Sequence, residues 1–295
     1  MLAPAAYPDA LRDEVERYLA ELRFSTEAPT KGLEDAMRYS LLAGGKRIRP
    51  VLALATAEAL GRPVEEVLPL AAAIELVHTY SLIHDDLPAM DDDDLRRGQP
   101  TLHVKHGEDV AILAGDGLFA EAMWLALQKQ EGEPANVLAA VSELTAAAGV
   151  GGMVGGQYVD VTAPGDLDPA GLRRLHELKT GRLIGASVEC VLLLTGAHDP
   201  SHTLSAFRAY AAELGVLFQI VDDILDVTGD EESLGKPQGS DERHGKRTYV
   251  SVFGLDRARE LAAESHRKAR EALAEAGGRT QTLELITDYI LTRPT

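Results

Sequence analysis

The sequence predicts an all-α protein, and three observations support this prediction. Apolar residues recur at helical spacing along most of the 295 residues. No segment sustains the alternation of apolar and polar residues that a half-buried strand requires. Alanine, leucine and glutamate, which favour helix, are frequent along the chain. No long or biased linker divides the sequence, so we expect a single domain over residues 1–295.

Each predicted helix is an apolar-periodic stretch bounded by glycine or proline. Gly44 follows the second stretch and Pro63 precedes the fourth. Gly165 stands before the seventh, and Gly277 separates the last two. The stretches predict about ten helices, at residues 9–22, 31–42, 48–60, 64–86, 108–130, 135–148, 169–194, 200–227, 251–276 and 280–291.

Composition and charge exclude several classes of function. The formal net charge of −18 argues against a nucleic-acid partner, because phosphate backbones require basic surfaces. Cys190 is the only cysteine, so no internal disulfide forms, and its apolar surroundings indicate a buried thiol in a reducing compartment. Residues 1–10 do not resemble a signal peptide, and charged residues interrupt each apolar run. We expect a cytoplasmic protein without membrane insertion.

The first candidate site is a crowded aspartate cluster at the end of an apolar helix. Asp85 and Asp86 close the helix, and four more aspartates follow at residues 91–94. Two such charges 4 Å apart repel by about 4 kcal/mol near a protein surface. Pro88 breaks the helix, which lets Asp85, Asp86 and Asp91 converge. A cluster of carboxylates without histidine or cysteine favours Mg²⁺, which substrate phosphates also bind. The alternative, a solvated acidic loop, does not explain why Asp85 and Asp86 close an apolar helix face.

The second cluster lies on a later helix. Gln219, Asp222 and Asp226 are spaced i, i+3 and i+7, so they form a polar stripe on a helix that is otherwise apolar, and Asp223 flanks them. A buried polar stripe requires partners, and the alternative of a solvent-facing stripe conflicts with the apolar neighbours. The pattern therefore predicts a second set of metal ligands.

Basic residues accompany both clusters. Lys46, Arg47 and Arg49 lie at a glycine-flanked turn that opens a helix, where backbone donors favour phosphate. Arg96 and Arg97 follow the first cluster. Lys236 and Lys246 follow the second cluster. Together these residues predict two anion sites bridged by metal ions.

At this level of detail the sequence resembles the trans-isoprenyl diphosphate synthases, and most closely the bacterial-type farnesyl diphosphate synthases. The resemblance covers essentially the whole chain, in the order of the family's motifs. It rests on residues 44–50, 82–101 (LIHDDLPAMDDDDLRRGQPT), 155–157, 179–181, 218–226 (FQIVDDILD) and 235–249. The resemblance implies an all-α isoprenoid-synthase bundle of ten or more helices around a central active-site cavity, usually as a homodimer.

The resemblance also implies roles for individual residues. Three Mg²⁺ ions, with Mn²⁺ as a substitute, bind Asp85, Asp91 and Asp222, supported by Asp86, Asp92, Asp223 and Asp226. The allylic diphosphate binds Arg96, Lys179, Lys236 and Lys246. Isopentenyl diphosphate binds Lys46, Arg49, His78 and Arg97. Thr180, Gln219 and the carbonyl of Lys179 face the allylic carbon. The reaction implied is ionisation of the allylic diphosphate, attack by isopentenyl diphosphate and loss of a proton.

Product length is expected to depend on Tyr80 and Ser81, on the helix before the first cluster. At a rise of 1.5 Å per residue, Tyr80 lies about 7–8 Å below Asp85, where a large ring can form the floor of the cavity. In the resembling family, an aromatic residue at this position, together with the Pro88–Ala89 insertion, is typical of enzymes that make the C15 product. A C20 product, or a Tyr80 that merely packs in the bundle, remains open.

Rival classes fit the sequence less well. A terpene cyclase has a different second metal motif and lacks the basic pair for a second diphosphate. A phosphohydrolase built on His84 and Asp85 would need further histidine ligands. An EF-hand is excluded by aspartate spacing. A non-catalytic subunit of a heteromeric prenyl synthase remains an alternative, although both clusters are intact.

Overall fold

The computed structural model describes residues 6–25, 27–162, 167–196, 202–229 and 247–293. In this part of the chain the all-α prediction is confirmed, since the β-structure consists of one two-residue hairpin, β1 (Leu95–Arg96) and β2 (Gln99–Pro100). The helices are α1 (Asp9–Glu21), η1 (Ala28–Thr30), α2 (Lys31–Leu41), α3 (Ile48–Ala59), η2 (Val64–Glu66), α4 (Leu68–Asp85), α5 (Leu102–His106), α6 (Glu108–Lys129), α7 (Pro134–Ala148), α8 (Met153–Thr162), α9 (Pro169–His176), η3 (Glu177–Gly181), α10 (Arg182–Leu194), α11 (His202–Thr228), α14 (Tyr249–Phe253), α15 (Leu255–Ala276) and α16 (Gln281–Thr292).

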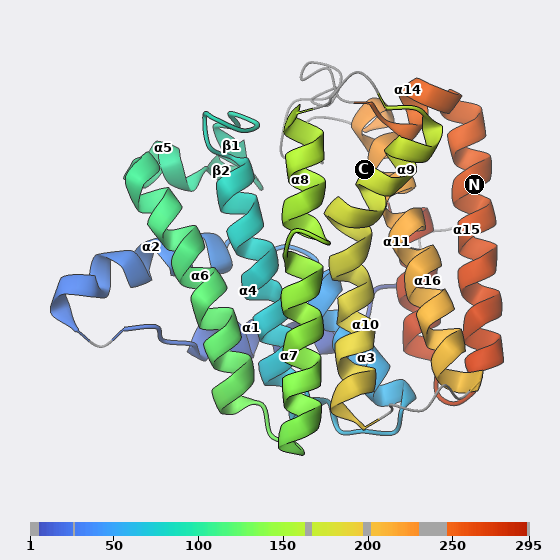
Figure 1. Cartoon of the computed structure of the whole chain (residues 1–295), viewed down its shortest axis with the longest axis horizontal. Coiled ribbons are helices and arrows are strands. Elements are labelled where there is room, and N and C mark those ends of the chain that lie inside the picture. The colour runs from blue at the N-terminus through green and yellow to red at the C-terminus, as the bar shows by residue number, and fades with distance from the viewer. Residues whose placement is uncertain (1–5, 26, 163–166, 197–201, 230–246, 294–295) are drawn as a thin grey trace.

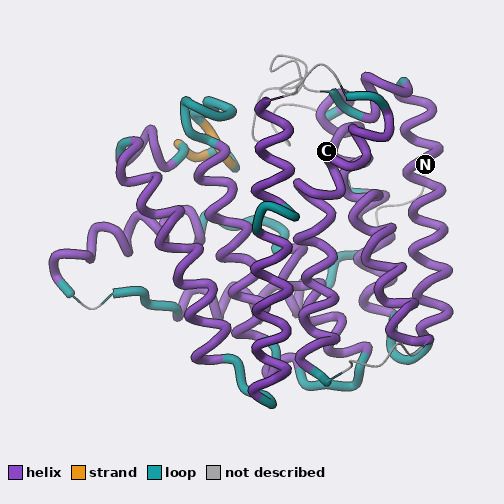
Figure 2. Tube along the Cα trace, in the orientation of Figure 1, coloured by secondary structure: helices purple, strands orange, loops and turns teal. Residues whose placement is uncertain are grey.

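The long helices stand side by side with roughly parallel axes (Figure 1). Helices α4 and α6 pack together at one side, α7 packs on α10 in the middle, and α11 packs on α15 at the other side. The tube view shows α8 continuing upward from α7 after a short loop (Figure 2). The bundle therefore places the ends of α4, α8 and α11, which carry the predicted motifs, at its upper end.

Helices α3 and α4 form the centre of the hydrophobic core. Every residue from 48 to 57 in α3, and every residue from 70 to 77 in α4, is buried. A helix that is apolar on all sides has neighbours on all sides, and α4 contacts α3, α6, α1 and α10. Cys190 is also buried, with its Sγ donating to the Ala140 carbonyl at 3.3 Å, and burial raises the pKa of its thiol well above the ordinary value. The predicted inert thiol is confirmed.

Some helix boundaries differ from the prediction. The stretch 169–194 is not one α-helix, because the π-helical turn η3 interrupts it between α9 and α10. The stretch 251–276 begins instead at α15, because Gly254 with a φ of 80° separates it from α14. Helices α5 and α8 were not predicted; α8 begins in a glycine-rich segment, 149–156, where the helical signal is weak.

Three helical stretches are long and apolar enough to cross a membrane, judged by length and composition alone. They are Glu108–Lys129, Pro134–Thr162 and His202–Thr228. Charged residues do lie within each stretch, but the expectation that they leave no run long enough for a membrane span is wrong. In the most apolar 18-residue window of each stretch, packing buries 61% of the last but only 39% and 44% of the first two. Helix α6 consequently exposes apolar side chains, among them Leu113 and Trp124.

Candidate active site

The turn after α4 folds the first aspartate cluster back on itself. The amide of Asp91 donates to the Asp85 carbonyl at 2.9 Å, so both residues lie at the same end of α4 and remain partly exposed. Asp86 is buried, and Arg96 Nε donates to its two oxygens at 2.7 and 2.9 Å. Burial raises the pKa of Asp86, and the Arg96 guanidinium opposes that change. Asp92 lies exposed in the turn with a φ of 52°.

The second cluster divides into exposed and buried members. Asp222 is partly exposed and forms an ion pair with Arg293, which follows α16. Asp223 is buried and accepts hydrogen bonds from Gln219 Nε2 at 2.8 Å and from the Tyr249 amide at 2.7 Å. Asp226 is also buried. Asp222 is thus the member of this cluster that is open to an incoming cation, and Asp223 links α11 to α14. 

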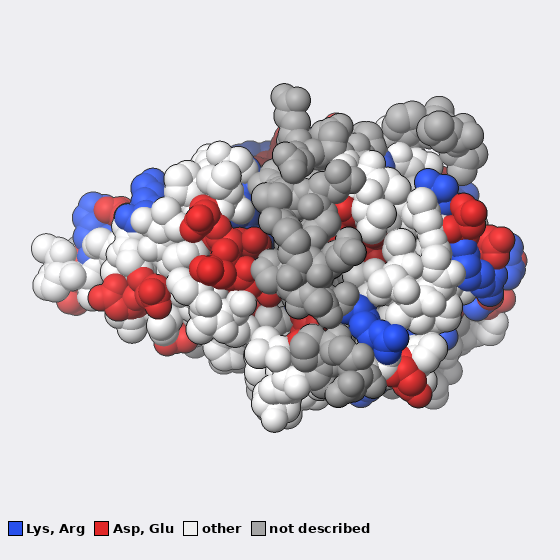
Figure 3. Space-filling model, turned by 90° about the horizontal axis from the view of Figure 1, so that it is seen from above, with Lys and Arg blue, Asp and Glu red and all other residues white. Residues whose placement is uncertain are grey.

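Viewed from the upper end of the bundle, several acidic side chains gather near the middle of the face (Figure 3). Among the described residues, no group of three or more histidine, cysteine, aspartate or glutamate side chains could hold a metal ion by itself. Magnesium commonly binds one or two carboxylates and completes its octahedron with water and substrate phosphates. The carboxylates of Asp85, Asp91 and Asp222 fit that chemistry, and Arg96 and Arg293 already pair with the neighbouring Asp86 and with Asp222 as counter-cations.

The π-helix η3 presents Lys179 and Thr180. Lys179 Nζ pairs with Asp160 of α8 at 2.5 Å. The Thr180 hydroxyl donates to Gln219 Oε1 at 2.8 Å, so Thr180, Gln219 and Asp223 form a continuous chain of hydrogen bonds. Because π-turns widen a helix locally, they often occur at functional sites. Sequence reasoning missed Asp160, since nothing in the spacing of α8 shows that it meets η3.

Close packing of α8 against η3 depends on Gly156. A Cβ atom added at Gly156 would lie 2.4 Å from the amide nitrogen of Lys179, closer than any side chain permits. The glycine of the 155–157 motif therefore lets α8 touch the turn that carries Lys179 and Thr180. Its neighbour Gln157 lines a cavity that Lys179 and Thr180 also line.

A group of basic side chains gathers around Arg49 and His78. Arg49 is buried and its Nη1 lies 3.3 Å from His78 Nε2. Burial, followed by the charges of Arg49 and Arg97, lowers the pKa of His78 well below its ordinary value. Burial also lowers the pKa of the Arg49 and Arg97 guanidinium groups. Cations held in such surroundings favour an anionic ligand, and Lys46 adds an exposed ammonium at the same turn.

Arg47, in contrast, does not belong to the anion site. The sequence placed it among three cations of a phosphate-binding turn, but its side chain is fully buried. It forms ion pairs with Glu16 and Glu75, each at 2.7 Å, and Nη2 donates to the Leu41 carbonyl at 2.6 Å. Arg47 has a positive φ of 52°, and these three partners hold the backbone in that conformation. Arg47 therefore anchors the turn from which Lys46 and Arg49 project.

One cavity of about 460 Å³ brings residues from four parts of the sequence together. Tyr80 is buried, and burial, with a smaller contribution from the Asp85 charge, raises the pKa of its hydroxyl to about 12. Ser81 donates to the His78 carbonyl at 2.8 Å within α4. The predicted site residues that line this cavity are Arg49, His78, Tyr80, Ser81, Asp85, Lys179 and Thr180. Lys236 and Lys246 lie outside the described residues.

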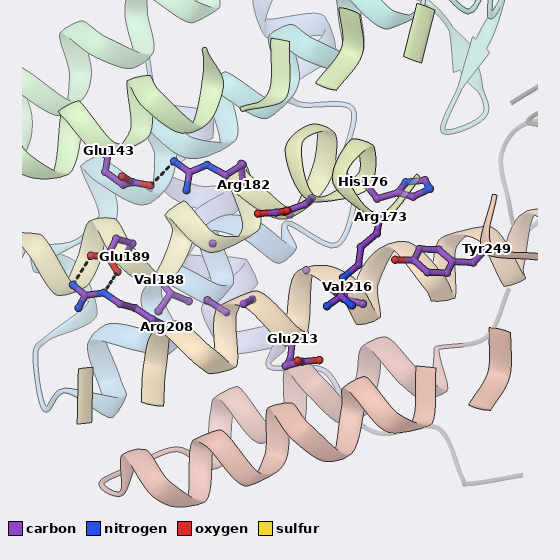
Figure 4. Close-up of a pocket in the computed structure, with 16 residues that line it drawn as sticks. Glu143, Arg173, His176, Arg182, Val188, Glu189, Arg208, Glu213, Val216 and Tyr249 are labelled. Atoms are coloured by element: carbon purple, nitrogen blue, oxygen red, sulfur yellow. Dashed lines mark hydrogen bonds and ion pairs between the residues drawn. The ribbon is translucent and has the colours of Figure 1, made fainter. Parts of the chain in front are cut away.

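A second cavity, of about 520 Å³, lies between α10 and α11 (Figure 4). Its rim holds two ion pairs, Arg182 with Glu143 at 3.2 Å and Arg208 with Glu189 at 2.7 Å. Gly181, at the end of η3, forms part of its wall. The π-helix thus contributes to both cavities, but the predicted metal and diphosphate ligands in the described ranges do not line this one.

Comparison with known proteins agrees with this geometry. The family model described as polyprenyl synthetase matches residues 30–288. The chain belongs to this family. Farnesyl diphosphate synthase of Escherichia coli (strain K12) is 44% identical over 285 residues, which cover 95% of this chain and 94% of that protein. The resemblance read from the motifs is confirmed.

Two further proteins similar to this chain bear on the product and the metal. A chloroplastic geranylgeranyl pyrophosphate synthase of Capsicum annuum is 44% identical over 265 residues, covering 88% of this chain and 71% of that protein. The crystal structure of geranyltransferase from Helicobacter pylori complexed with magnesium and isoprenyl diphosphate has a TM-score of 0.84, with 33% identity and 98% coverage of both chains. The isoprenyl-synthase fold predicted from the sequence is therefore also confirmed.

Proposed function

We propose that this protein is a trans-prenyltransferase that joins isopentenyl diphosphate to dimethylallyl or geranyl diphosphate and releases farnesyl diphosphate. The observation that supports it best is the shared cavity. The buried guanidinium of Arg49 with the imidazole of His78 beside it, the carboxylate of Asp85, and the π-turn with Lys179 and Thr180 all line one space. Two diphosphates with their reacting carbons between them would satisfy all of these groups.

The two diphosphates are assigned to different walls. Arg96, held by Asp86, and Lys179, held by Asp160, would bind the leaving diphosphate of the allylic substrate. Arg49, His78 and Arg97, with Lys46 at the rim, would bind the diphosphate of isopentenyl diphosphate. Lys236 and Lys246 remain proposed allylic ligands on the strength of the family resemblance alone.

Bound magnesium would supply Lewis-acid stabilisation of the leaving diphosphate. Its ligands would be Asp85, Asp91 and Asp222, supported by Asp86, Asp92, Asp223 and Asp226. We propose three ions, with Mn²⁺ as a substitute. The protein then contributes orientation and preorganised charge. Because the Thr180 hydroxyl donates its hydrogen bond to Gln219 Oε1, the lone pairs of its oxygen remain available to stabilise the allylic cation. Isopentenyl diphosphate forms the new C–C bond, and the proton that is lost passes to the released diphosphate.

The C15 product is proposed from Tyr80. Its buried ring and neighbouring Ser81 line the cavity near Asp85, so a growing chain directed down α4 would meet the ring. Sequence identity to the relatives does not separate the two products, because a farnesyl and a geranylgeranyl synthase are each 44% identical to this chain. The alternative of a geranylgeranyl synthase therefore depends on how well Tyr80 closes the cavity.

We further propose that the whole chain acts as one catalytic domain, as a cytoplasmic homodimer. One hydrophobic cluster extends from Leu11 to Ile290, which supports a single domain. The exposed apolar side chains of α6, Ile112, Leu113, Trp124 and Leu127, offer a surface for a second copy.

The test is incubation with isopentenyl diphosphate, each allylic starter and Mg²⁺, followed by chromatography of the dephosphorylated products. We expect mainly C15 alcohol. A mainly C20 product would reject the length assignment, and no product from the isolated chain would favour a non-catalytic subunit. Asp85→Ala and Asp222→Ala should each lower kcat by at least about a hundredfold, and near-normal rates would reject those ligands.

A further inference from the structure

Helices α4 and α6 run antiparallel and meet in a defined register around Tyr80. The Tyr80 ring lies 5.3 Å from the Phe119 ring, at an interplanar angle of 74°. One turn further along each helix, His84 of α4 lies against Gly115 of α6. Residues 80 and 84 are four apart on α4, as are 119 and 115 on α6, so the two contacts are successive rungs of one interface.

Gly115 makes room for the His84 imidazole. A Cβ atom at Gly115 would lie 2.1 Å from His84 Nε2, so the ring occupies the volume that any other residue at 115 would fill. His84 Nε2 lies 3.1 Å from the Ile112 carbonyl, which fixes the ring against α6. From there His84 meets the Tyr80 ring edge to face, with centroids 5.7 Å apart at 77°.

Two edge-to-face contacts therefore hold the Tyr80 ring, one from its own helix and one from α6. Within the described residues, the Tyr80 hydroxyl makes no hydrogen bond that would fix the ring instead. Tyr80 and His84 line the cavity, whereas Phe119 does not and lies behind the tyrosine. The position of the ring in the cavity thus depends in part on Phe119, a residue that does not line the cavity.

We propose that Phe119 and the His84–Gly115 contact are positioning elements for product length, acting through Tyr80. This inference rests on the proposed prenyl-transfer activity. A ring supported on both sides blocks the growing chain, whereas a ring that has lost a support turns aside and admits one more isoprene unit. Product length is therefore a property of the α4–α6 register as well as of residue 80.

The experiment compares products of the wild type, Phe119→Ala, Tyr80→Ala and the double variant under one assay. Phe119→Ala should raise the ratio of C20 to C15 product about fivefold or more, the population change expected when one aromatic contact is lost. In the Tyr80→Ala background the same change should alter the ratio less than about twofold, because its target is gone. An unchanged ratio in Phe119→Ala, or fully multiplicative effects, would overturn the positioning role.

Two further variants separate positioning from loss of stability. Phe119→Leu keeps most of the volume without an aromatic ring, and should still lengthen the product if Phe119→Ala does not fold. Phe207→Ala removes a buried ring about 18 Å along α11 from Gln219, and should lower the melting temperature without changing product length. A product shift with Phe207→Ala equal to that with Phe119→Ala would reject the inference.

Gly115→Ala tests the second support. The added methyl group should displace His84, tilt Tyr80 and lower the share of C15 product, and an unchanged product profile would contradict this. The wild-type products alone test the proposed function, whereas the ratios between variants and wild type test this inference. The two can therefore fail separately.

Discussion

At the scale of single residues, Arg293 occupies the carboxylate of Asp222 that is predicted to bind metal. Its guanidinium pairs with Asp222 and lies over the Phe218 ring at 4.7 Å, with its side chain mostly buried. If Asp222 binds Mg²⁺, that ion must replace Arg293. Arg293→Gln should therefore bind Mg²⁺ more tightly, by about fivefold for an ion pair worth about 1 kcal/mol at this half-exposed carboxylate.

The measurement for Arg293→Gln is a calorimetric titration of the protein with Mg²⁺ in the presence of inorganic diphosphate, which needs no turnover. Arg267→Gln is a matched control, because Arg267 pairs with Glu271 on the exposed face of α15. Equal affinity in wild type and Arg293→Gln would show that the pair does not compete with the metal.

The lowered pKa of His78 predicts how the free energy of unfolding depends on pH. Its folded-state pKa is depressed by burial and by Arg49, so below the ordinary pKa of about 6.5 the unfolded chain binds a proton that the folded chain excludes. The free energy of unfolding should then fall with decreasing pH, by up to about 1.4 kcal/mol per pH unit. Above that pKa, His78 should not contribute to the pH dependence of the free energy of unfolding.

His78→Gln should flatten the fall in stability between about pH 6.5 and 5. Urea unfolding at a series of pH values measures this, and the variant minus wild-type difference isolates the residue. His202→Gln serves as the control, because His202 is exposed at the start of α11. Parallel curves for wild type and His78→Gln would contradict a neutral, buried His78.

At the scale of elements, the contact between α8 and η3 controls the position of the reacting groups. Gly156→Ala places a methyl group where the Lys179 amide lies, so η3 must shift. A displacement of about 1 Å at a catalytic group can cost about a hundredfold in rate, and we expect a loss of that size in kcat. Steady-state kinetics with saturating substrates measures it.

Gly185→Ala is the control for this change. Gly185 lies inside α10, and a Cβ atom there would meet nothing within 4 Å. Alanine should stabilise the helix by up to about 1 kcal/mol and leave kcat unchanged. Normal turnover in Gly156→Ala would mean that the close approach of α8 does not position Lys179.

The elements also show how far the sequence could predict this structure. Helical periodicity identified α3, α4 and α6 because their apolar residues follow one another over several turns. It could not identify η3, since a π-turn differs from an α-turn by one extra residue and has no pattern of its own. Arg47 was misplaced for a related reason. Its partners Glu16 and Glu75 are distant in sequence, and only the packing of α1 and α4 brings them together.

At the scale of the whole molecule, the proposed homodimer must form despite a net charge of −18 on each chain. Burial of the apolar face of α6 would supply the favourable term, and mutual repulsion would oppose it. Salt screens the repulsion, with a Debye length of about 10 Å at 0.1 M, so dimerisation should tighten as salt rises. A surface held by ion pairs would respond in the opposite direction.

Leu113→Glu tests this surface directly. Leu113 is 56% exposed on α6, and a carboxylate there would be desolvated in the dimer, so the variant should be monomeric at concentrations where the wild type is dimeric. Leu285→Glu, at a 41% exposed leucine of α16, should leave the dimer intact. Sedimentation equilibrium at two salt concentrations distinguishes these outcomes. The exposed apolar area on α6 is the structural reason for expecting a dimer. A dimeric Leu113→Glu variant would place the interface elsewhere, and a monomeric wild type would reject the dimer.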